Sequence, residues 1–434
     1  MSLPRYGEYK TSGVPWLAEV PSHWQLHLAR RLFEQRRDAS LPEDEQLSAT
    51  QKYGVIPQRL FMEQEDQKVV LALGGLENFK RVQPDDFVIS LRSFQGGIER
   101  SRYAGCVSPA YTVLRPNPEL VPRFWEYLLK SSSYIAALQT TTDGIRDGKN
   151  ISYGQFGALC VPLAPPDEQA AIAAFLDRET AKIDSLVAEQ ERLIALLAEK
   201  RQATISHGVT RGLNPNAPMK DSGVAWLGEV PAHWEVVGLT KYLESVVDYR
   251  GRTPTKVDEG VFLVTAKNIR DGVIDYEASQ EYIAPAEYDD VMRRGLPMAG
   301  DVLFTTEAPL GQVASVDRED IALAQRIIKF RADSKRLRND FLKFWVMGSA
   351  CQFNLEQLAT GSTALGIKGS KIGQVRLCLP PSEEQADIVS YIESEASRLV
   401  RLEAQADVAI DLLKERRSAL IAAAVTGQVD VRGA

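Results

Sequence analysis

Histidines and cysteines are the first residues to inspect for chemistry, because they supply most general bases, nucleophiles and transition-metal ligands. The 434-residue chain has only four of each. No His-x₃-His or Cys-x₂-Cys pair offers the spacing of a metal site. His23 and His233 lie in a repeated Pro-x-His-Trp element, which favours a packed, hydrogen-bonded role over catalysis. The sequence therefore predicts no bound metal and no catalytic histidine.

The four cysteines, Cys106, Cys160, Cys351 and Cys378, lie far apart and do not suggest a disulfide framework. Cys160 and Cys378 fall in apolar, strand-like runs. We expect them to be buried free thiols, because an isolated cysteine usually packs as a small hydrophobic residue.

Two glycine-containing loops resemble a phosphate cradle but lack its key residues. Residues 361–368 read GSTALGIK, with Ile367 where a P-loop needs lysine after its second glycine. Residues 144–150 read GIRDGKN and are too short. Neither loop predicts a nucleotide site, and we expect no cofactor on this chain.

Charge and hydropathy limit the class of protein further. The net charge is −7, so any basic face for nucleic acid must be local. No stretch approaches the roughly 18 consecutive apolar residues of a membrane helix. The first residues, MSLPRYGEYKTSG, lack the apolar core of a signal peptide. We expect a cytoplasmic protein that does not enter the membrane.

The chain is an internal repeat. Residues 12–26 read SGVPWLAEVPSHWQL and residues 222–236 read SGVAWLGEVPAHWEV, with ten of fifteen positions identical. A second pair follows, LAPPDEQ at 163–169 and LPPSEEQ at 379–385, and DFVISLRSFQG from Asp86 matches DVLFTTEAPLG from Asp301. Such spacing predicts two copies of one folding unit.

Each copy ends in a long amphipathic helix. Segments 167–207 and 383–424 carry apolar residues at steps of three and four, as in a heptad seam. Two prolines precede each segment and an acidic pair opens it, and both features favour a helix start. The predicted seam comprises Ile172, Leu176, Ile183, Leu186, Leu193, Leu197, Ile388, Ile392, Leu399, Leu402, Leu413 and Leu420.

A helix of about 60 Å with one apolar stripe must pair in water. An antiparallel pair within the chain is our first expectation, and a coiled coil between two chains is the alternative. The sequence predicts a first head over residues 1–162, a first helix over 163–212, a second head over 213–378, and a second helix with a tail over 379–434.

The heads have the pattern of mixed α and β structure. Apolar runs at 87–91, 111–116, 261–266, 301–306 and 326–330 predict strands. Segments 123–139 and 340–358 predict equivalent amphipathic helices. The fold class is therefore α+β, with two similar heads, two long helices and a pseudo-two-fold repeat.

The repeated Trp-Leu-x-Glu-Val-Pro-x-His-Trp element and the Pro-Pro-x-Glu-Gln helix start resemble the specificity subunits of Type I restriction-modification systems. The resemblance covers essentially the whole chain and includes SPAYTVLRP at 108–116 and segment 251–272. It implies that each head is a target-recognition domain for one half of a split double-stranded DNA site. It also implies that the helices form a spacer and bind two methyltransferase (modification) subunits.

Those partners and the restriction subunits are expected to carry the S-adenosylmethionine, ATP and Mg²⁺ chemistry, so this chain is not an enzyme. Candidate DNA contacts need donors and acceptors on loops. In the first head we select Arg92, Ser93, Gln95, Arg146, Lys149 and Asn150. In the second head we select Arg250, Arg252, Thr253, Lys267, Asn268, Arg270, Lys368 and Lys371.

Two other readings of the sequence are open. A coiled-coil scaffold with two heads for non-DNA ligands predicts no affinity for a methyltransferase subunit. A nuclease with an unrecognised carboxylate cluster predicts metal-dependent turnover by the pure chain.

Overall fold

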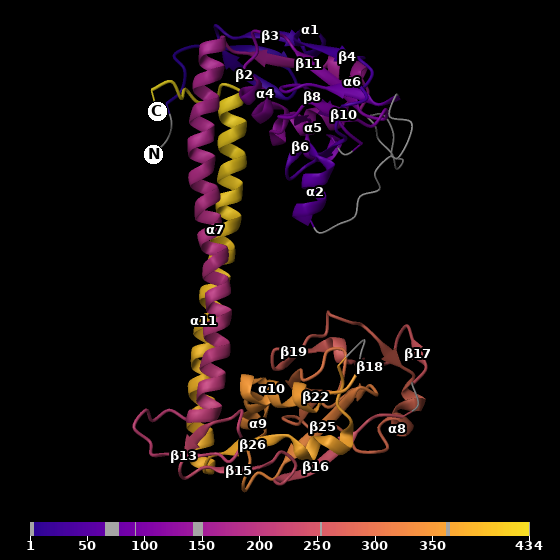
Figure 1. The fold of residues 1–434 in the computed structure, drawn as a ribbon, viewed down its shortest axis with the longest axis vertical. Coiled ribbons are helices and arrows are strands. Elements are labelled where there is room, and N and C mark those ends of the chain that lie inside the picture. The colour runs from indigo at the N-terminus through magenta and orange to yellow at the C-terminus, as the bar shows by residue number, and fades with distance from the viewer. Residues whose placement is uncertain are drawn as a thin grey trace. The chain divides into compact units, whose positions relative to one another are not determined.

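The computed structural model describes residues 4–65, 78–91, 93–141, 151–251, 254–361 and 365–433. It divides the chain into two compact units (Figure 1). Unit 1 comprises residues 1–190 and 408–434, and unit 2 comprises residues 191–407. Helices α7 (Pro166–Arg211) and α11 (Ser382–Val425) each contribute one part to unit 1 and the other to unit 2.

Unit 1 is built on a four-stranded antiparallel sheet. Its order is β4 (Phe33–Arg36), β11 (Thr112–Pro116), β8 (Phe87–Ile89) and β9 (Glu99–Arg100). Its inner face packs in a core of large aromatic side chains, including Phe33, Phe87, Trp125 and Phe156. Further pairs are β1 (Tyr9–Val14) with β2 (Leu17–Pro21), β3 (Gln25–Leu28) with β12 (Cys160–Leu163), β5 (Leu47–Thr50) with β6 (Gly54–Pro57), and β7 (Lys80–Val82) with β10 (Gly105–Val107).

Unit 2 repeats this sheet. Its order is β16 (Leu243–Asp248), β25 (Ile327–Ala332), β22 (Val302–Thr305) and β23 (Val313–Ser315). Hairpin β13 (Met219–Asp221) with β14 (Glu229–Pro231), and pair β15 (Glu235–Gly238) with β26 (Arg376–Leu379), match β1–β2 and β3–β12. We call this shared set of sheet, hairpin and strand pair the frame.

The segment between β16 and β22 distinguishes unit 2. It contributes β17 (Lys256–Val257), β21 (Tyr282–Ile283) and β18 (Val261–Val264) to a second sheet, which β24 (Ile321–Leu323), from the segment between β23 and β25, completes beside β18. It also adds the hairpin of β19 (Ile269–Arg270) and β20 (Val273–Ile274), and the short helix α8 (Tyr288–Val291). A separate apolar core, with Leu263 and Ile321, fills this addition.

The two amphipathic segments of the heads are each broken into two helices. Segment 123–139 forms α4 (Pro122–Leu129) and α5 (Ser132–Thr140), and segment 340–358 forms α9 (Asn339–Met347) and α10 (Ser349–Leu358). Ser131 caps α5 by accepting a hydrogen bond from Tyr134 N. Gly348 separates the other pair, and a Cβ there would lie 2.9 Å from Val209 Cγ2 of α7. Shorter helices in the heads are α1 (Ala29–Leu32), α2 (Gln58–Glu65), α3 (Ser93–Gly96) and α6 (Tyr153–Ala158).

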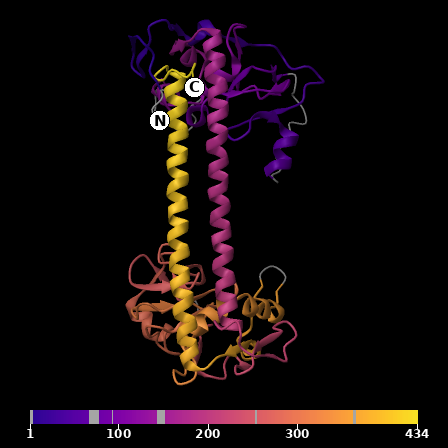
Figure 2. The same ribbon diagram turned by 90° about the vertical axis from the view of Figure 1, so that its left-hand side faces the viewer.

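Within each unit, parts of α7 and α11 pack against one another (Figure 2). In unit 1, Ile172 and Leu176 share a core with Ile421, and Asp184 pairs with Arg417 at 2.8 Å. In unit 2, Gly208 faces Ile392, and a Cβ at 208 would lie 3.1 Å from its Cδ1. The segments therefore run in opposite directions within each unit.

The buried stripe of the helices differs from the predicted seam at three positions. Leu186, Leu193 and Leu402 are 45%, 40% and 39% exposed, which corrects their assignment. Ile172, Leu176, Ile183, Leu197, Ile388, Ile392 and Leu399 are buried, and Leu413 and Leu420 are half-buried. In α7 the half-buried positions between Ile183 and Leu197 are Val187, Gln190 and Ile194. The true seam therefore follows a four-three alternation from Ile183, and each misassigned leucine lies one position before it.

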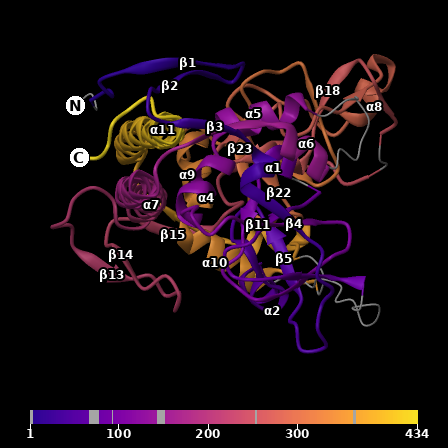
Figure 3. The same ribbon diagram turned by 90° about the horizontal axis from the view of Figure 1, so that it is seen from above.

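The two termini lie together in unit 1. Asp430 N donates to Pro4 O at 2.8 Å, and Tyr9 Oη donates to Gln428 O at 3.2 Å. Figure 3 shows β1 and β3 beside the C-terminal part of α11. All four cysteines are free, and Cys106, Cys351 and Cys378 are buried. Among the described residues, no helix is long and apolar enough to span a membrane.

Candidate nucleic-acid interface

The repeated histidine and tryptophan form the same contact in both units. In unit 1, Glu168 at the start of α7 accepts from Trp24 Nε1 at 3.0 Å, and its Oε2 lies 2.8 Å from His23 Nε2. In unit 2, Glu384 makes the equivalent contacts at 3.1 Å with Trp234 and 2.7 Å with His233. The hydrogen-bonded role predicted for both histidines is confirmed, but the predicted packing is not, because the side chains of His23 and His233 are 42% and 48% exposed.

The glutamine that follows each glutamate ties the helix start to the head. Gln169 Oε1 accepts from Trp125 Nε1 at 3.1 Å and from Val121 N at 3.0 Å. Gln385 Oε1 accepts from Arg338 N at 2.9 Å. Both glutamines are fully buried. The most recognisable residues of the repeat therefore build the frame and leave the variable loops to contact a ligand.

Each frame also contains a buried aspartate just before the third strand of its sheet, and the sequence did not predict a role for it. Asp301 accepts from Arg331 Nε at 2.7 Å and from Lys329 Nζ at 3.1 Å. Burial acts to raise the pKa of Asp301, but these bonds and one from Met298 N hold it below its usual value. Asp86 is the equivalent in unit 1, where burial prevails over Arg36 and raises the pKa. The aligned DFV and DVL segments were the available signal.

One end of each four-stranded sheet collects the loops that differ between the units. In unit 2, β16 and β22 end there, and β25 and β23 begin there. Ile367 N bonds Thr306 O at 2.9 Å, which brings Lys368 to the same end as Arg250 and Arg326. In unit 1 the corresponding end carries α3 with Ser93 and Gln95. We call these the loop ends of the two sheets.

In the first head, the structure places two of the predicted DNA contacts. Gln95 is exposed on α3. Ser93 is 1% exposed, and its Oγ accepts from Ser90 N at 2.8 Å. Ser93 therefore shapes the loop and does not face a ligand, which corrects its assignment. Arg92, Arg146, Lys149 and Asn150 lie outside the described residues.

In the second head, the structure separates surface residues from buried ones. Lys267 and Arg270 are exposed beside the β19–β20 hairpin, and Lys368 is exposed before the turn at Gly369–Gln374. Lys371 is half-buried, and its Nζ donates to Leu358 O at 2.9 Å. Arg252 and Thr253 lie outside the described residues.

Asn268 is fully buried, which corrects its assignment as a DNA contact. Its Oδ1 accepts from Thr265 N at 2.9 Å, and its Nδ2 donates to Asp275 O at 2.9 Å and Ser279 O at 2.8 Å. These bonds fix the turn that carries Lys267, so Asn268 positions its neighbour.

Arg250 is exposed at the loop end of unit 2 and pairs with Asp248. Its Nε lies 2.9 Å from Asp248 Oδ2. Burial acts to raise the pKa of Asp248, but the bonds from the Arg250 side chain and backbone lower it below its usual value. The carboxylate is therefore ionised at neutral pH and holds the arginine in place.

Known proteins are similar to this chain in sequence and in fold. Residues 293–410 match the family described as Type I restriction modification DNA specificity domain. The chain is 23% identical over 365 residues to the Type I restriction enzyme EcoKI specificity subunit of Escherichia coli (strain K12), covering 81% of this chain and 76% of the relative. It is 24% identical to the MjaVIII specificity subunit of Methanocaldococcus jannaschii, covering 70% of each.

The chain thus contains a region that matches the Type I restriction modification DNA specificity domain, and the relatives it resembles are named as specificity subunits of Type I restriction enzymes. Among the described residues, no group of three or more His, Cys, Asp or Glu side chains has the arrangement of a metal site.

Solved structures show that the fold is that of a specificity subunit. A chain from a structure of the assembly and conformational transition of a type I R-M system matches with a TM-score of 0.68 and 15% identity, covering 94% of this chain and 98% of the other. The HsdS subunit from Thermoanaerobacter tengcongensis matches with a TM-score of 0.55 and 17% identity, covering 98% and 100%.

The family match falls on one half of the repeat. Residues 293–410 include β22, β23, β25, α9 and α10 and reach into α11. They omit Arg250, Lys267 and Arg270, which lie in the segment that distinguishes unit 2. The specificity-subunit signature thus lies mainly in the frame, while three of the candidate contacts lie in the variable part.

Proposed function

We propose that this specificity subunit recognises a bipartite, asymmetric DNA site, with each head reading one half. The observation that carries the proposal is the repeated frame with unlike loop ends. The same sheet and the same Glu–Trp contact occur in both units, whereas the segments beside the loop ends differ. Two different readers on one frame suit two different half-sites.

The local charges support DNA as the ligand. Arg250, Lys267, Arg270 and Lys368 are exposed in the second head, although the whole chain has a net charge of −7. Lysine and arginine bind phosphates and base edges. Because the overall field repels DNA, we propose that much of the phosphate affinity comes from partner subunits.

We propose that α7 and α11 form one antiparallel coiled coil that acts as the spacer and binds two methyltransferase subunits. Both helices carry exposed apolar side chains outside their seams. In unit 1 these are Leu186, Val408 and Leu412, and in unit 2 they are Leu193, Leu196, Val400 and Leu402. Apolar groups on an otherwise polar helix surface are typical of a protein-binding face.

Under this proposal, the methyltransferase subunits supply S-adenosylmethionine chemistry, and restriction subunits supply ATP- and Mg²⁺-dependent cleavage. The predicted domain boundaries and the cytoplasmic location belong to the same proposal. The pure chain should neither methylate nor cut DNA when supplied with all three cofactors.

A head exchange tests the central proposal. Residues 14–160 are replaced by the matching segment of a relative, and the target is mapped by methylation sequencing of the assembled complex. We expect one half-site to change and the other to stay the same. The reciprocal exchange of residues 224–376 is the matched control and should change the opposite half. If either exchange altered both halves, the two-reader proposal would be wrong.

A further inference from the structure

We infer that Arg250 reads a guanine in the half-site of the second head, with Asp248 as the residue that positions its guanidinium. The inference rests on the proposed function, because it assigns one base contact within a head that reads DNA.

The guanidinium of Arg250 is held along one edge only. Its Nε lies 3.1 Å from Oδ1 and 2.9 Å from Oδ2 of Asp248, and Nη2 also bonds Oδ2. Nη1 has no partner within the described part of the chain. The outer edge, formed by Nη1 and the second N–H of Nη2, is therefore available. A guanine presents O6 and N7 as two adjacent acceptors that fit two parallel N–H donors.

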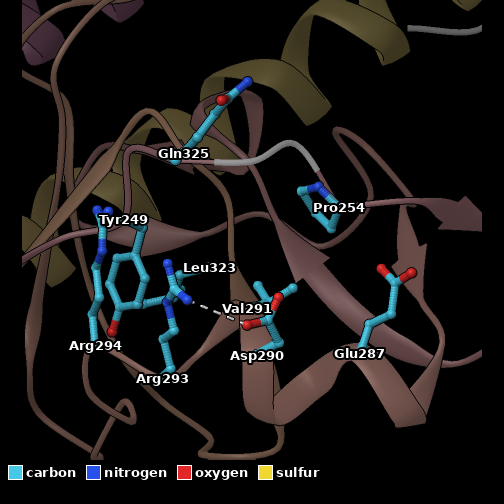
Figure 4. Close-up of a pocket in the computed structure, with 10 residues that line it drawn as sticks. Tyr249, Pro254, Glu287, Asp290, Val291, Arg293, Arg294, Leu323 and Gln325 are labelled. Carbon is cyan, nitrogen blue, oxygen red and sulfur yellow. Dashed lines mark ion pairs between the residues drawn. The ribbon is translucent and has the colours of Figure 1, made fainter.

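The backbone around Arg250 is also fixed. Arg294 Nη1 donates to Asp248 O at 2.6 Å and to Arg250 O, and Arg250 N donates to Asp248 Oδ1 at 3.0 Å. Figure 4 shows Arg294 beside Tyr249, at one side of a hollow of about 100 Å³. A guanidinium that is already held in position loses less conformational freedom on binding than the side chain of a free arginine does.

Gly369 makes room for this arrangement. A Cβ at position 369 would lie 2.5 Å from Arg250 Nη2 and 2.7 Å from Asp248 Oδ2. Both contacts are with side-chain ends and not with the backbone. An alanine there would displace the guanidinium from its position without disturbing the strand pairing.

The surrounding charge favours a base over a phosphate. Asp248 neutralises Arg250, and Glu307, at the same loop end, pairs with Arg326 at 2.9 Å. Because Asp248 already neutralises its charge, the Arg250 guanidinium gains less from a phosphate than a free arginine would, while its outer edge still fits the two acceptors of guanine. In unit 1, Arg36 shows the contrasting case, since Nη1 bonds Asp38 at 2.7 Å while Nε and Nη2 face Asp86. Both edges of Arg36 are occupied, so it has none left for DNA.

The test uses the full chain assembled with its methyltransferase subunits and a randomised library of DNA duplexes. The half-site of the second head should contain a G·C pair. Arg250→Ala and Arg250→Lys should each reduce discrimination at that one position by about 5- to 150-fold, since lysine keeps the charge but loses the paired donors. Asp248→Asn and Gly369→Ala should relax the same position, and the other half-site should be unaffected.

Arg293→Ala is the matched control, because Arg293 is 68% exposed and its one ion pair among the described residues is with Asp290, at 3.6 Å. It should leave every position unchanged. Uniform weakening of all sequences by Arg250→Ala, with a flatter salt dependence, would make Arg250 a phosphate contact and overturn the inference. An unchanged preference with normal thermal unfolding would overturn it too. A wild-type complex without any sequence preference would instead refute the proposed function.

Discussion

At the scale of single residues, Glu168 shows how a repeated motif can serve folding and leave chemistry to others. One carboxylate oxygen receives donors from Trp24 and His23, which lie 144 and 145 positions earlier in the chain. Trp24 is fully buried. The contact thus joins the first head to the start of α7, and we expect it to contribute to the free energy of unfolding.

Glu168→Ala should therefore destabilise the chain. The buried indole N–H of Trp24 would lose its acceptor, at a cost of about 1–3 kcal/mol. Urea unfolding followed by tryptophan fluorescence gives the measurement. Asp167→Ala is the control, because Asp167 is exposed in the same helical turn and contributes only about 0.3–1 kcal/mol through the helix dipole. Equal shifts for both variants would contradict the proposed role of the contact.

Glu99 is predicted to make stability depend on pH. Its side chain is buried, and Oε2 bonds Lys130 Nζ at 2.8 Å. Burial raises its pKa from 4.5 to about 7, against the opposing effect of Lys130. Between these values the folded chain holds a proton that the unfolded chain has lost, so stability falls as pH rises through this window. The full contribution is about 3 kcal/mol.

Unfolding of the wild type and Glu99→Gln between pH 4.5 and 8 measures this effect. Relative to the variant, the wild type should lose stability up to about pH 7 and then stay level. A difference that does not vary with pH would show that Glu99 titrates normally in the folded chain.

Lys267 should bind a phosphate, because it is exposed and its turn is fixed by the bonds of Asn268. In the assembled complex, Lys267→Ala should weaken all DNA sequences alike and lower the slope of log affinity against log salt by about one. Lys335 is the control, since it is exposed in the turn after β25, at the end of the four-stranded sheet opposite its loop end. If Lys335→Ala had the same effect, the assignment of Lys267 as a phosphate contact would be wrong.

Sequence reasoning located the variable loops but did not separate ligand contacts from loop supports. Ser93 and Asn268 are polar loop residues like their neighbours Gln95 and Lys267, yet both are buried and bonded to backbone groups. Their roles depend on carbonyl and amide groups brought close by folding. Residue type alone contains no information about those partners.

At the scale of elements, strands and long helices were predictable and the phase of the helix seam was not. The expected strands at 87–91, 111–116, 261–266, 301–306 and 326–330 correspond to β8, β11, β18, β22 and β25 and are confirmed. The buried face of a long helix is harder to predict, because exposed leucines can repeat with the same period of seven as the leucines of the seam. Leu186 and Leu193 follow that period outside the buried stripe.

This distinction predicts opposite effects for two neighbours on α7. Ile183 is 5% exposed, so Ile183→Asp should bury an unpaired charge and destabilise the chain by several kcal/mol. Leu186 is 45% exposed, so Leu186→Asp should leave unfolding nearly unchanged. If α7 binds a methyltransferase subunit there, Leu186→Asp should weaken the complex instead. Thermal unfolding and a subunit-binding assay, run on both variants, separate the two effects. If both variants destabilised the chain equally, Leu186 would belong to the buried seam after all.

At the scale of the whole molecule, the repeat was the most informative feature of the sequence. Offsets of 210 to 216 between matching segments predicted two related heads before any strand was assigned. The sheet of β17, β21, β18 and β24 was not predicted as a sheet, although strand β18 was, because among the described residues only unit 2 has it. A repeat predicts what the copies share, and the differences that set specificity are by nature absent from the pattern.

The continuity of α7 and α11 gives the last prediction, which concerns the spacing of the half-sites. Both helices contribute residues to both units, and they contain 46 and 44 residues, or about 69 and 66 Å of helix. Adding seven residues to each, after Gln190 in α7 and after Asp407 in α11, keeps the seam in phase and lengthens each helix by about 10 Å.

Methylation sequencing of the assembled complex should then show a longer spacer, by up to about three base pairs at 3.4 Å each, with both half-site sequences unchanged. Insertion of seven residues into α7 alone is the control, since it shifts one helix against the other and should reduce stability without defining a new spacer. A matched insertion that left the spacer unchanged would show that the helices do not set the distance. A changed half-site would show that they also orient the readers within the heads.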